Sequence, residues 1–462
     1  MDNITAVILA AGLGTRMKSK KAKVLHQAGG MTLIEHVAAT AASIAPPERI
    51  AVVVGHQGEL VEAVLGSRGV RFALQREQLG TGHAVAACRD LLAPLGGDVV
   101  VLLGDCPLLS PATVERLVSV QRGSQAAATV ITTVLEDPSG YGRIVRAADA
   151  SVAAIVEHKA ATAAERAIRE INSGIYCFRG ELLWKYLDEI GTDNPAGEYY
   201  LTDIVAILRR RGYSVAPLLI EDPAELLGIN TRAELAQVDA VFRARKVLQL
   251  MLDGVTIEKP ETVTIDAAVA IGPDTVIEPF ARLLGRTTVG EDCRIGACSI
   301  VRDSELADGV EILPFTSIES SSVGPGAHIG PYARLRMNAR VKDGARVGNF
   351  VEMKNSELGV GAKSQHLAYL GDATIGDGAN IGAGTITCNY DGARKHPTAI
   401  GAGAFIGSNS TLVAPIEIGA GSYVAAGSVV TAPVPADALA LGRARQVVKE
   451  GWARKRRETR AK

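Results

Sequence analysis

The sequence predicts an α/β protein with three parts: an open, mostly parallel sheet of Rossmann-like type in residues 1–230, a helical connector in 231–254 and a parallel β-helix in 255–462. Two observations support this prediction. In the first part, short apolar runs alternate with helix-like segments, which is the pattern of an open α/β sheet. In the last part, aliphatic residues recur at every sixth position, which is the pattern of hexapeptide repeats.

Three short and nearly continuous apolar runs define strands expected in the first part: Ile4–Leu9, Ile50–Val54 and Asp98–Leu103. Runs of this kind are typical of parallel strands that are buried on both faces. Helix starts lie between and after these runs, with a capping-box pattern at Thr32–Glu35 and a capping serine followed by proline at Ser110–Pro111. This alternation favours a single open sheet.

Two further helices are expected before the repeats begin. Residues Leu201–Arg211 are apolar on one face and stop at Gly212. Thr231 and Glu234 form another capping-box pattern, and the apolar residues after it keep helical spacing until Gly254. This second segment is long enough to make a stiff connector between domains.

The period of six defines the second half of the chain. It is neither the 3.6 of an α-helix nor the 2 of an ordinary strand. A hexapeptide β-helix explains it, because each hexad supplies one short strand and one turn, and its aliphatic residue points into a three-sided prism. The first run comprises Val323, Ile329, Leu335, Val341 and Val347, and the second comprises Ile400, Ile406, Leu412, Ile418, Val424 and Val430.

The period of six is interrupted in two places. The intervals from Val347 to Ile375 and from Ile381 to Ile400 span 28 and 19 residues, and neither is a multiple of six. The second interval contains the polar stretch Thr387–His396, which is too long for a corner of the prism. Departures from a strong local pattern are expected at functional sites. We therefore expect chemistry in both intervals.

Composition and charge exclude several classes of protein. The chain carries 49 Lys and Arg against 50 Asp and Glu, and 4% aromatic residues, which argues against a nucleic-acid binder. Its 47% hydrophobic residues exclude a disordered chain. We expect no membrane span, because no apolar run reaches 18 residues. The six cysteines form no CxxC pair and the N-terminus does not look like a secretory leader. These features predict reduced thiols, a cytoplasmic location and no zinc site.

The segment Leu9–Met17 is glycine-rich and directly follows the first strand. Glycines there let backbone N–H groups approach a phosphate, and Arg16 and Lys23 add positive charge. The pattern is neither a Walker motif nor a dinucleotide fingerprint, so a tight turn with surface cations is the alternative. Asp105 follows another buried strand, at the sheet edge where open α/β folds bind ligands. It is a candidate Mg²⁺ ligand, or else a turn residue.

A set of short motifs follows in the order seen in sugar-nucleotide pyrophosphorylases. With the repeats behind them, the chain resembles, nearly end to end, the bacterial family of bifunctional N-acetylglucosamine-1-phosphate uridylyltransferases and glucosamine-1-phosphate N-acetyltransferases. The motifs are Leu9–Met17, Lys23–Leu25, Gln75, Leu79–Gly82, Gly104–Asp105, Gly140–Arg143, Val156–Lys159, Asn172–Tyr176 and Gly228–Asn230.

The resemblance implies a left-handed β-helix, a homotrimer, and uridylyl transfer from UTP with Mg²⁺. Arg16 and Lys23 would be catalytic, and Asp105 and Asn230 would bind the metal. Nucleotide contacts would come from Leu9, Ala10, Ala11, Gly12, Lys23, Gln75, Gly80 and Thr81, and sugar contacts from Gly140, Glu157, Asn172 and Asn230.

The resemblance also implies acetyl transfer from acetyl-CoA to glucosamine 1-phosphate, with His366 as the base. A neutral imidazole can accept a proton from the substrate amine near pH 7, although a lone histidine in a coil loop is more often a surface residue. Sugar-phosphate contacts would come from Arg336, Lys354, Tyr369 and Lys395, and Asn380 would contact the amino sugar. Acetyl-CoA contacts would come from Ala383, Asn389, Tyr390, Ser408, Ala426 and Arg443.

Two positions depart from the family pattern. Ala22 stands where the family usually has proline, which loosens the loop that carries Lys23, and Leu103 stands where it commonly has tyrosine. The basic tail after Trp452 matches a C-terminal arm that meets the CoA phosphates of a neighbouring chain, or it is a solubilising end. Two other functions stay open: a pyrophosphorylase whose β-helix only regulates or oligomerises, and a scaffold like the subunits of exchange-factor assemblies.

Overall fold

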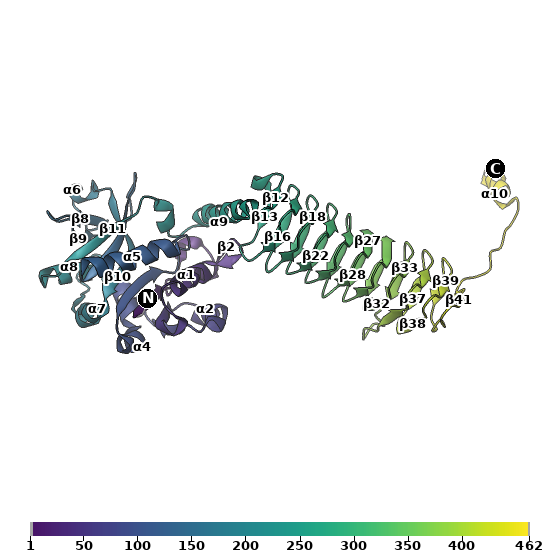
Figure 1. The fold of residues 1–462 in the computed structure, drawn as a ribbon, viewed down its shortest axis with the longest axis horizontal. Coiled ribbons are helices and arrows are strands. Elements are labelled where there is room, and N and C mark those ends of the chain that lie inside the picture. Colours follow the sequence, from purple (N-terminus) through teal and green to yellow (C-terminus); the bar gives the residue numbers. More distant parts are fainter. Residues whose placement is uncertain (1–2, 461–462) are drawn as a thin grey trace. The chain divides into compact units, whose positions relative to one another are not determined.

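The computed structural model describes residues 3–460 and divides the chain into two compact units, Met1–Phe242 and Arg243–Lys462. The first unit runs from purple to teal in Figure 1, and the second from teal to yellow. The division falls inside one continuous helix, α9 (Arg232–Leu252).

The first unit is built on one nine-stranded sheet with the main order β11-β7-β10-β6-β1-β4-β5. All neighbours on this path are parallel except those of β10, which runs against β6 and β7. The predicted open and mostly parallel sheet is confirmed. The strands are β1 (Ile4–Leu9), β4 (Ile50–Val54), β5 (Arg71–Leu74), β6 (Asp98–Leu103), β7 (Ala128–Val134), β8 (Arg143–Arg146), β9 (Val152–Val156), β10 (Glu170–Arg179) and β11 (Val215–Leu219), with a separate pair β2 (Gln27–Ala28) and β3 (Met31–Thr32).

Helices cover both faces of this sheet (Figure 1). Successive residues of a strand point to opposite faces, so Ile8 of β1 belongs to one buried cluster and Val7 to the other. One face packs against α1 (Leu33–Ala42), α2 (Gly58–Leu65) and α5 (Pro111–Ser124), and the other against α3 (Thr81–Ala86), α4 (Arg89–Leu92), α7 (Gly180–Tyr186) and α8 (Asp203–Arg210). The short α6 (Ala163–Arg166) precedes β10.

The predicted capping boxes form as hydrogen-bonded pairs. The Thr32 hydroxyl accepts from the Glu35 backbone N–H at 3.3 Å, and the Glu35 carboxylate accepts from the Thr32 N–H at 2.8 Å. Thr231 and Glu234 make the same exchange at 3.2 and 2.7 Å. Each box satisfies two backbone donors that a helix start would otherwise leave unpaired.

The helix α9 supplies core residues to both units. Val238 is 1% exposed within the first unit, and the ring of Phe242 stacks on His36 with centroids 4.0 Å apart. Further along the helix, Val247 and Leu250 belong to the buried cluster of the second unit. The helix is therefore a structural part of each unit.

The second unit is a three-sided parallel β-helix with sheets of eleven, ten and nine strands, here called the first, second and third faces. Each strand pairs in parallel with the strand one coil later. The first face contains β12 (Thr256–Ile257), β15 (Val276–Ile277), β18 (Arg294–Ile295), β21 (Glu311–Ile312), β24 (His328–Ile329), β27 (Arg346–Asn349), β30 (Lys363–His366), β33 (Asn380–Ile381), β36 (Phe405–Ile406), β39 (Tyr423–Val424) and β41 (Leu439–Ala440).

The other two faces repeat the same arrangement. The second face contains β13 (Thr264–Ile265), β16 (Arg282–Leu284), β19 (Ile300–Arg302), β22 (Ser317–Glu319), β25 (Arg334–Arg336), β28 (Glu352–Lys354), β31 (Tyr369–Gly371), β34 (Ile386–Cys388), β37 (Thr411–Val413) and β40 (Val429–Val430). The third face contains β14 (Ala270–Ile271), β17 (Thr288–Val289), β20 (Glu305–Leu306), β23 (Ser322–Val323), β26 (Arg340–Val341), β29 (Glu357–Leu358), β32 (Ala373–Ile375), β35 (Thr398–Ile400) and β38 (Ile416–Ile418).

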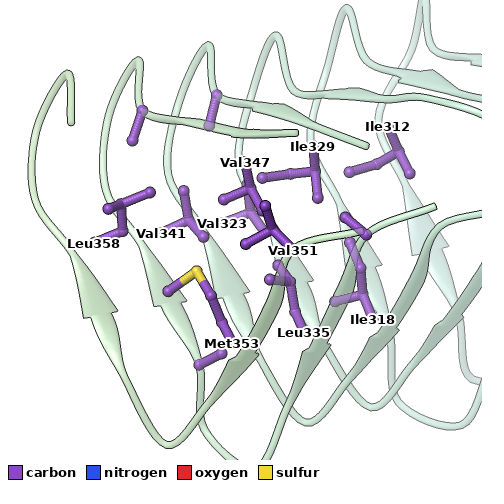
Figure 2. Packing of buried hydrophobic residues seen from close by; sticks show 14 of the residues in the cluster. Ile312, Ile318, Val323, Ile329, Leu335, Val341, Val347, Val351, Met353 and Leu358 are labelled. Atoms are coloured by element: carbon purple, nitrogen blue, oxygen red, sulfur yellow. The ribbon is translucent and has the colours of Figure 1, made fainter. Parts of the chain in front are cut away.

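The aliphatic residues of the six-residue period fill the interior of the prism. All eleven predicted positions are buried, and the most exposed of them, Val430, is 6% exposed. Figure 2 shows Ile329, Leu335 and Val341 pointing inward from successive strands. This packing confirms the hexapeptide β-helix and fixes which side chains of each strand face outward.

The two interruptions of the period have different structural origins. Between Val347 and Ile375 the corner from the second to the third face is one residue short in each of two coils, with Met353, Leu358 and Leu370 still buried. The same short corner joins Val301 to Leu306 and Ile318 to Val323, in coils that carry no predicted site residue. A corner one residue short therefore explains the interruption, and the expectation of chemistry in this interval stays a prediction.

The second interruption is a real insertion. The chain leaves the second face at Cys388 and returns on the third face at Thr398. Between them Tyr390 and Lys395 form an antiparallel bridge, which makes a small hairpin at the corner. The polar stretch singled out in the sequence is thus an irregular loop on a regular prism.

The described part of the chain ends in a short exposed helix, α10 (Trp452–Arg460), which carries the basic residues of the tail. No helix within residues 3–460 is long and apolar enough to cross a membrane. All six cysteines are free thiols, and four of them are buried.

The shared helix leads to a prediction about fragment stability. A fragment of residues 1–242 should unfold at a higher temperature than one of residues 1–230, because it keeps the contacts of Val238 and Phe242. Burying each such side chain contributes about 1.5–3 kcal/mol, which corresponds to a difference of roughly 6–12 °C for two of them. Thermal unfolding followed by circular dichroism measures this, and equal midpoints would show that the start of α9 adds nothing to the first unit.

Candidate active sites

A cavity of about 340 Å³ opens where β1 and β6 end in Leu9 and Leu103. This is the carboxyl edge of the parallel strands, where open α/β sheets bind ligands. The structure brings all eight predicted nucleotide contacts into its lining: Leu9, Ala10, Ala11, Gly12, Lys23, Gln75, Gly80 and Thr81.

A second cavity of about 430 Å³ adjoins the first, and Leu9, Thr81, Leu103 and Asp105 line both. Its lining includes Arg16 and the four residues predicted for the sugar, namely Gly140, Glu157, Asn172 and Asn230. The two predicted sets, from distant parts of the chain, therefore meet around Asp105.

Cationic side chains and oxygen ligands converge at this junction. The Lys23 ammonium forms an ion pair with the Asp105 carboxylate and donates to Asn230 Oδ1 at 3.2 Å. The Arg16 guanidinium donates to the same oxygen at 2.8 Å. Two hard oxygen donors beside a phosphate-sized space fit Mg²⁺, which takes few protein ligands. Within residues 3–460 there is no cluster of three or more His, Cys, Asp or Glu side chains that could hold a metal by themselves.

The sugar-side cavity is rich in fixed polar groups. Asn172 Oδ1 accepts from the Gly174 N–H and the Tyr176 hydroxyl, both at 3.0 Å, so the position of its side chain is set. Burial raises the pKa of Glu157, whose carboxylate accepts from the Thr202 hydroxyl at 3.4 Å. A rigid amide and a partly desolvated carboxylate suit the recognition of sugar hydroxyls.

Sequence reasoning missed the segment 198–202. Glu198 lines the first cavity, and Leu201 and Thr202 line the second. The sequence places Leu201 at a helix start, but α8 begins at Asp203. The segment instead pairs with the loop at residues 79–82 through Tyr199 and Gly82, whose backbone atoms hydrogen-bond at 2.8 Å. A run of one acidic residue and two tyrosines before the helix was the available signal.

Gly80 lets these two segments approach closely. Its φ is +115°, and a Cβ there would lie 2.5 Å from the Tyr199 carbonyl oxygen. Only glycine fits both the conformation and the space. The Gln75 amide, 4% exposed, donates to the Gly80 carbonyl at 3.1 Å and fixes this wall of the cavity.

The loop at Ala22 is held by a hydrogen bond that proline could not make. The Ala22 N–H donates to Gln57 Oε1 at 2.8 Å, and Gln57 Nε2 donates to the Lys20 carbonyl at 2.6 Å. Ala22 is 3% exposed with φ −54°. Gln57 thus restrains the loop at Ala22, the position where the family usually has proline.

Leu103 stands where the family commonly has tyrosine, and it presents an apolar side chain to both cavities.

In the second unit, two predicted contacts to the sugar phosphate lie next to each other on neighbouring strands. Arg336 of β25 and Lys354 of β28 are direct neighbours on the second face. The Arg336 guanidinium donates to Glu352 at 2.6 Å, and Lys354 is 6% exposed. Tyr369 of β31 pairs with Glu352. These side chains therefore form one continuous patch on that face.

The inserted hairpin adds Lys395 to this patch. The neighbouring Lys354 ammonium lowers the pKa of Lys395. Partial burial alone raises the pKa of Asp372, but hydrogen bonds from Asn355 and Asn389 and the charges of the two lysines bring it below its usual value. The hairpin is thus anchored beside the cationic patch.

The predicted acetyl-CoA contacts fall into two groups. Ala383, Ser408 and Ala426 follow one another on successive coils at the corner between the first and second faces, and Arg443 donates to the Ala426 carbonyl at 2.9 Å. Asn389 and Tyr390 lie in the hairpin at the next corner. One chain therefore does not gather all six residues at one edge.

His366 and Asn380 belong to the first face. His366 is the last residue of β30, directly before the corner that leads to Tyr369, and its side chain is exposed. Asn380 pairs with Lys363 one coil earlier. The base candidate thus lies near the same corner as the first acetyl-CoA group and one strand away from the cationic patch.

The fold and the two sites define a two-part transferase. A MobA-like NTP transferase domain matches residues 6–175, and models of the bacterial transferase hexapeptide and of the hexapeptide repeat of succinyl-transferase match residues 268–303 and 397–432. The relatives include bifunctional protein GlmU from Solibacter usitatus, 58% identical over 98% of each chain, from Koribacter versatilis, 50% identical over 97% of this chain and 96% of the relative, and from Brevibacillus brevis, 49% identical over 98% of each. The chain belongs to the family of bifunctional GlmU proteins.

The Gln57 contacts lead to a prediction about uridylyl transfer. Gln57→Ala removes two loop hydrogen bonds, each worth about 0.5–1.5 kcal/mol, and should lower kcat/KM for this reaction roughly tenfold. Adding Ala22→Pro should restore most of the loss, because φ −54° lies within the range of proline. His56→Ala, the change at the exposed neighbour, is the matched control. Equal rates for Gln57→Ala and the wild type would contradict the restraint.

Proposed function

We propose that the C-terminal unit transfers the acetyl group of acetyl-CoA to glucosamine 1-phosphate, and that the N-terminal unit then transfers a uridylyl group from UTP to N-acetylglucosamine 1-phosphate. The single observation that carries the assignment of the N-terminal unit is the pair of adjoining cavities that meet at Asp105. One is lined by the predicted nucleotide contacts and the other by the predicted sugar contacts. That arrangement allows the two substrates to meet at one point.

Uridylyl transfer brings two anions together. The sugar phosphate oxygen attacks the α-phosphorus of UTP, the bond to the β-phosphate oxygen breaks, and pyrophosphate leaves. No protein nucleophile is needed. Lys23 and Arg16, both within hydrogen-bonding distance of Asn230, offset the repulsion and stabilise charge on the leaving group.

Asp105 and Asn230 would hold Mg²⁺ in this site. Bound there, the ion would neutralise phosphate charge, which lowers the barrier to anionic attack. The Lys23 ammonium already binds both oxygens in the structure. This contact supports a cation-binding role for the pair.

Acetyl transfer needs a neutral amine. His366 would accept a proton from the substrate ammonium, and the amine nitrogen would then attack the thioester carbonyl carbon. The C–S bond would break while the second proton of the nitrogen passes to the leaving sulfur, which gives the amide and free CoA thiol. Arg336, Lys354 and Lys395 form the cationic patch for the sugar phosphate. A bound phosphate would relieve the repulsion that lowers the pKa of Lys395.

A homotrimer would unite the two groups of acetyl-CoA contacts. They occupy different edges of the prism, and a neighbouring copy can place its hairpin beside another copy's small-residue edge. Packing three-sided rods around a three-fold axis creates grooves of this kind. The predicted acetyl-CoA contacts lie at two different edges of one chain, and this division supports a homotrimer. Sedimentation of the full chain would test it by measuring the mass of the assembly.

Asp105→Asn should abolish uridylyl transfer and leave acetyl transfer intact. The change removes a negative charge from the predicted metal site and breaks the ion pair with Lys23. Electrostatic contributions of this kind are typically worth about a hundredfold or more in rate. The test follows pyrophosphate release over a Mg²⁺ titration, and full activity at limiting Mg²⁺ would exclude the metal role.

His366→Ala should slow acetyl transfer by about 10²–10⁴-fold, the usual contribution of a general base. Uridylyl transfer from ready-made N-acetylglucosamine 1-phosphate should not change. Free CoA thiol and pyrophosphate are followed separately on one preparation, with its oligomeric state checked. Acetyl transfer within a few-fold of the wild type would show that another group or water removes the proton.

A further inference from the structure

The strand that carries His366 is paired in an unusual way. On the first face, β27 and β30 have four residues each, whereas the other strands of this face within residues 3–460 have two. The longer pairing extends the register as far as Asn349 and His366, which become direct partners.

Gly348 makes this longer pairing possible. A Cβ at this position would lie 1.9 Å from the Gln365 carbonyl oxygen, closer than any side chain permits. The two backbones therefore approach more closely here than a residue with a side chain would allow. The close approach holds Asn349 beside His366 as both strands reach the corner.

The two side chains form a hydrogen bond. His366 Nδ1 lies 2.8 Å from Asn349 Oδ1. An amide oxygen only accepts hydrogen bonds, so Nδ1 must carry the proton. Nε2 then holds the free lone pair, and the structure gives Nε2 no hydrogen bond within residues 3–460. The exposed ring thus presents its basic nitrogen to solvent.

We propose that Asn349 is a positioning residue for acetyl transfer, which fixes the tautomer and orientation of the His366 imidazole. This role rests on the proposed function of His366 as the base. A neutral amide suits the task better than a carboxylate, because a negative charge at this distance would raise the pKa of the imidazole. The Asn349 amide holds the ring without placing a charge beside it.

The charged and titratable groups nearest in the fold are on the neighbouring strands. Arg346 and Lys363 begin β27 and β30, and Glu352 and Tyr369 lie past the corner on the second face. None of these four forms a hydrogen bond with His366 in the described part of the chain. Asn349 is thus the side chain that sets the state of this ring.

The test compares Asn349→Leu and Asn349→Asp in the full-length enzyme. In the leucine variant the rate of acetyl transfer should fall about 10–100-fold, which is the effect of removing the hydrogen-bond partner of a metal-bound histidine. The acidic side of its kcat/KM profile should not move to higher pH. The aspartate variant should keep the tautomer but raise the imidazole pKa. The acidic side of its kcat/KM profile for acetyl transfer should therefore move up by about one to three pH units. At pH values above this side of the profile, its rate should recover to within about threefold of the wild type.

A matched control lies on the same face. His328 Nδ1 contacts the Glu311 carboxylate at 2.7 Å, with the same 17-residue separation and away from the proposed site. Glu311→Gln should leave the acetyl-transfer profile unchanged. Uridylyl transfer, measured on every variant, reports whether the chain is folded.

His366→Ala separates the two ideas. An inactive His366→Ala enzyme, together with Asn349→Leu within twofold of the wild type at all pH values, would overturn the positioning role and leave the base role standing. An unshifted acidic side of the kcat/KM profile in Asn349→Asp would also overturn it. A His366→Ala enzyme with near-normal acetyl transfer would instead remove the base role, and the positioning role with it.

Discussion

The second half of the structure depends on one constraint: each strand must place a buried side chain inside the prism, in most strands an aliphatic one and in β30 and β34 Ser364 and Thr387. Ile329, Leu335 and Val341 meet this constraint on three successive faces. Once the inward residues are fixed, the outward residues of consecutive coils stand in columns, since parallel pairing aligns them. Arg336 and Lys354 become neighbours for this reason, and so do Asn349 and His366. The site residues are therefore positioned by the interior, although they do not belong to it.

The first half relies on a different constraint. Parallel strands end at the same edge of the sheet, so loops that are distant in sequence meet there. Lys23, Asp105 and Asn230 come from three such loops and share hydrogen bonds. Two of these contacts join a cation to an oxygen ligand, which lets the charges balance before any substrate arrives. A site that binds two anions gains from cations whose positions are already restrained.

Much of this arrangement could be predicted from the sequence, and the failures have physical reasons. The eleven inward positions follow from a strict period, and the cavity residues follow from motifs whose order is specific. The segment 198–202 could not be placed, because its partner is the backbone at residues 79–82 and backbone pairing leaves little trace in sequence. The Gln57 contact was missed for a related reason: one side chain restrains a loop 35 residues away. The cause of each interruption could not be read from spacing alone, because a corner one residue short and an inserted hairpin both break a count of six.

The corner between the second and third faces varies in length without disturbing the prism. It closes with one residue fewer between Ile318 and Val323, with the full number between Leu335 and Val341, and with a whole hairpin after Cys388. In all three cases the inward residues on either side stay buried. Loop length at this corner is therefore free to evolve independently of the core. During evolution, loops that carry functional residues could be gained or exchanged at this corner one coil at a time. A protein engineer could likewise graft a new loop at the same corner, because the strands of the β-helix would keep their spacing.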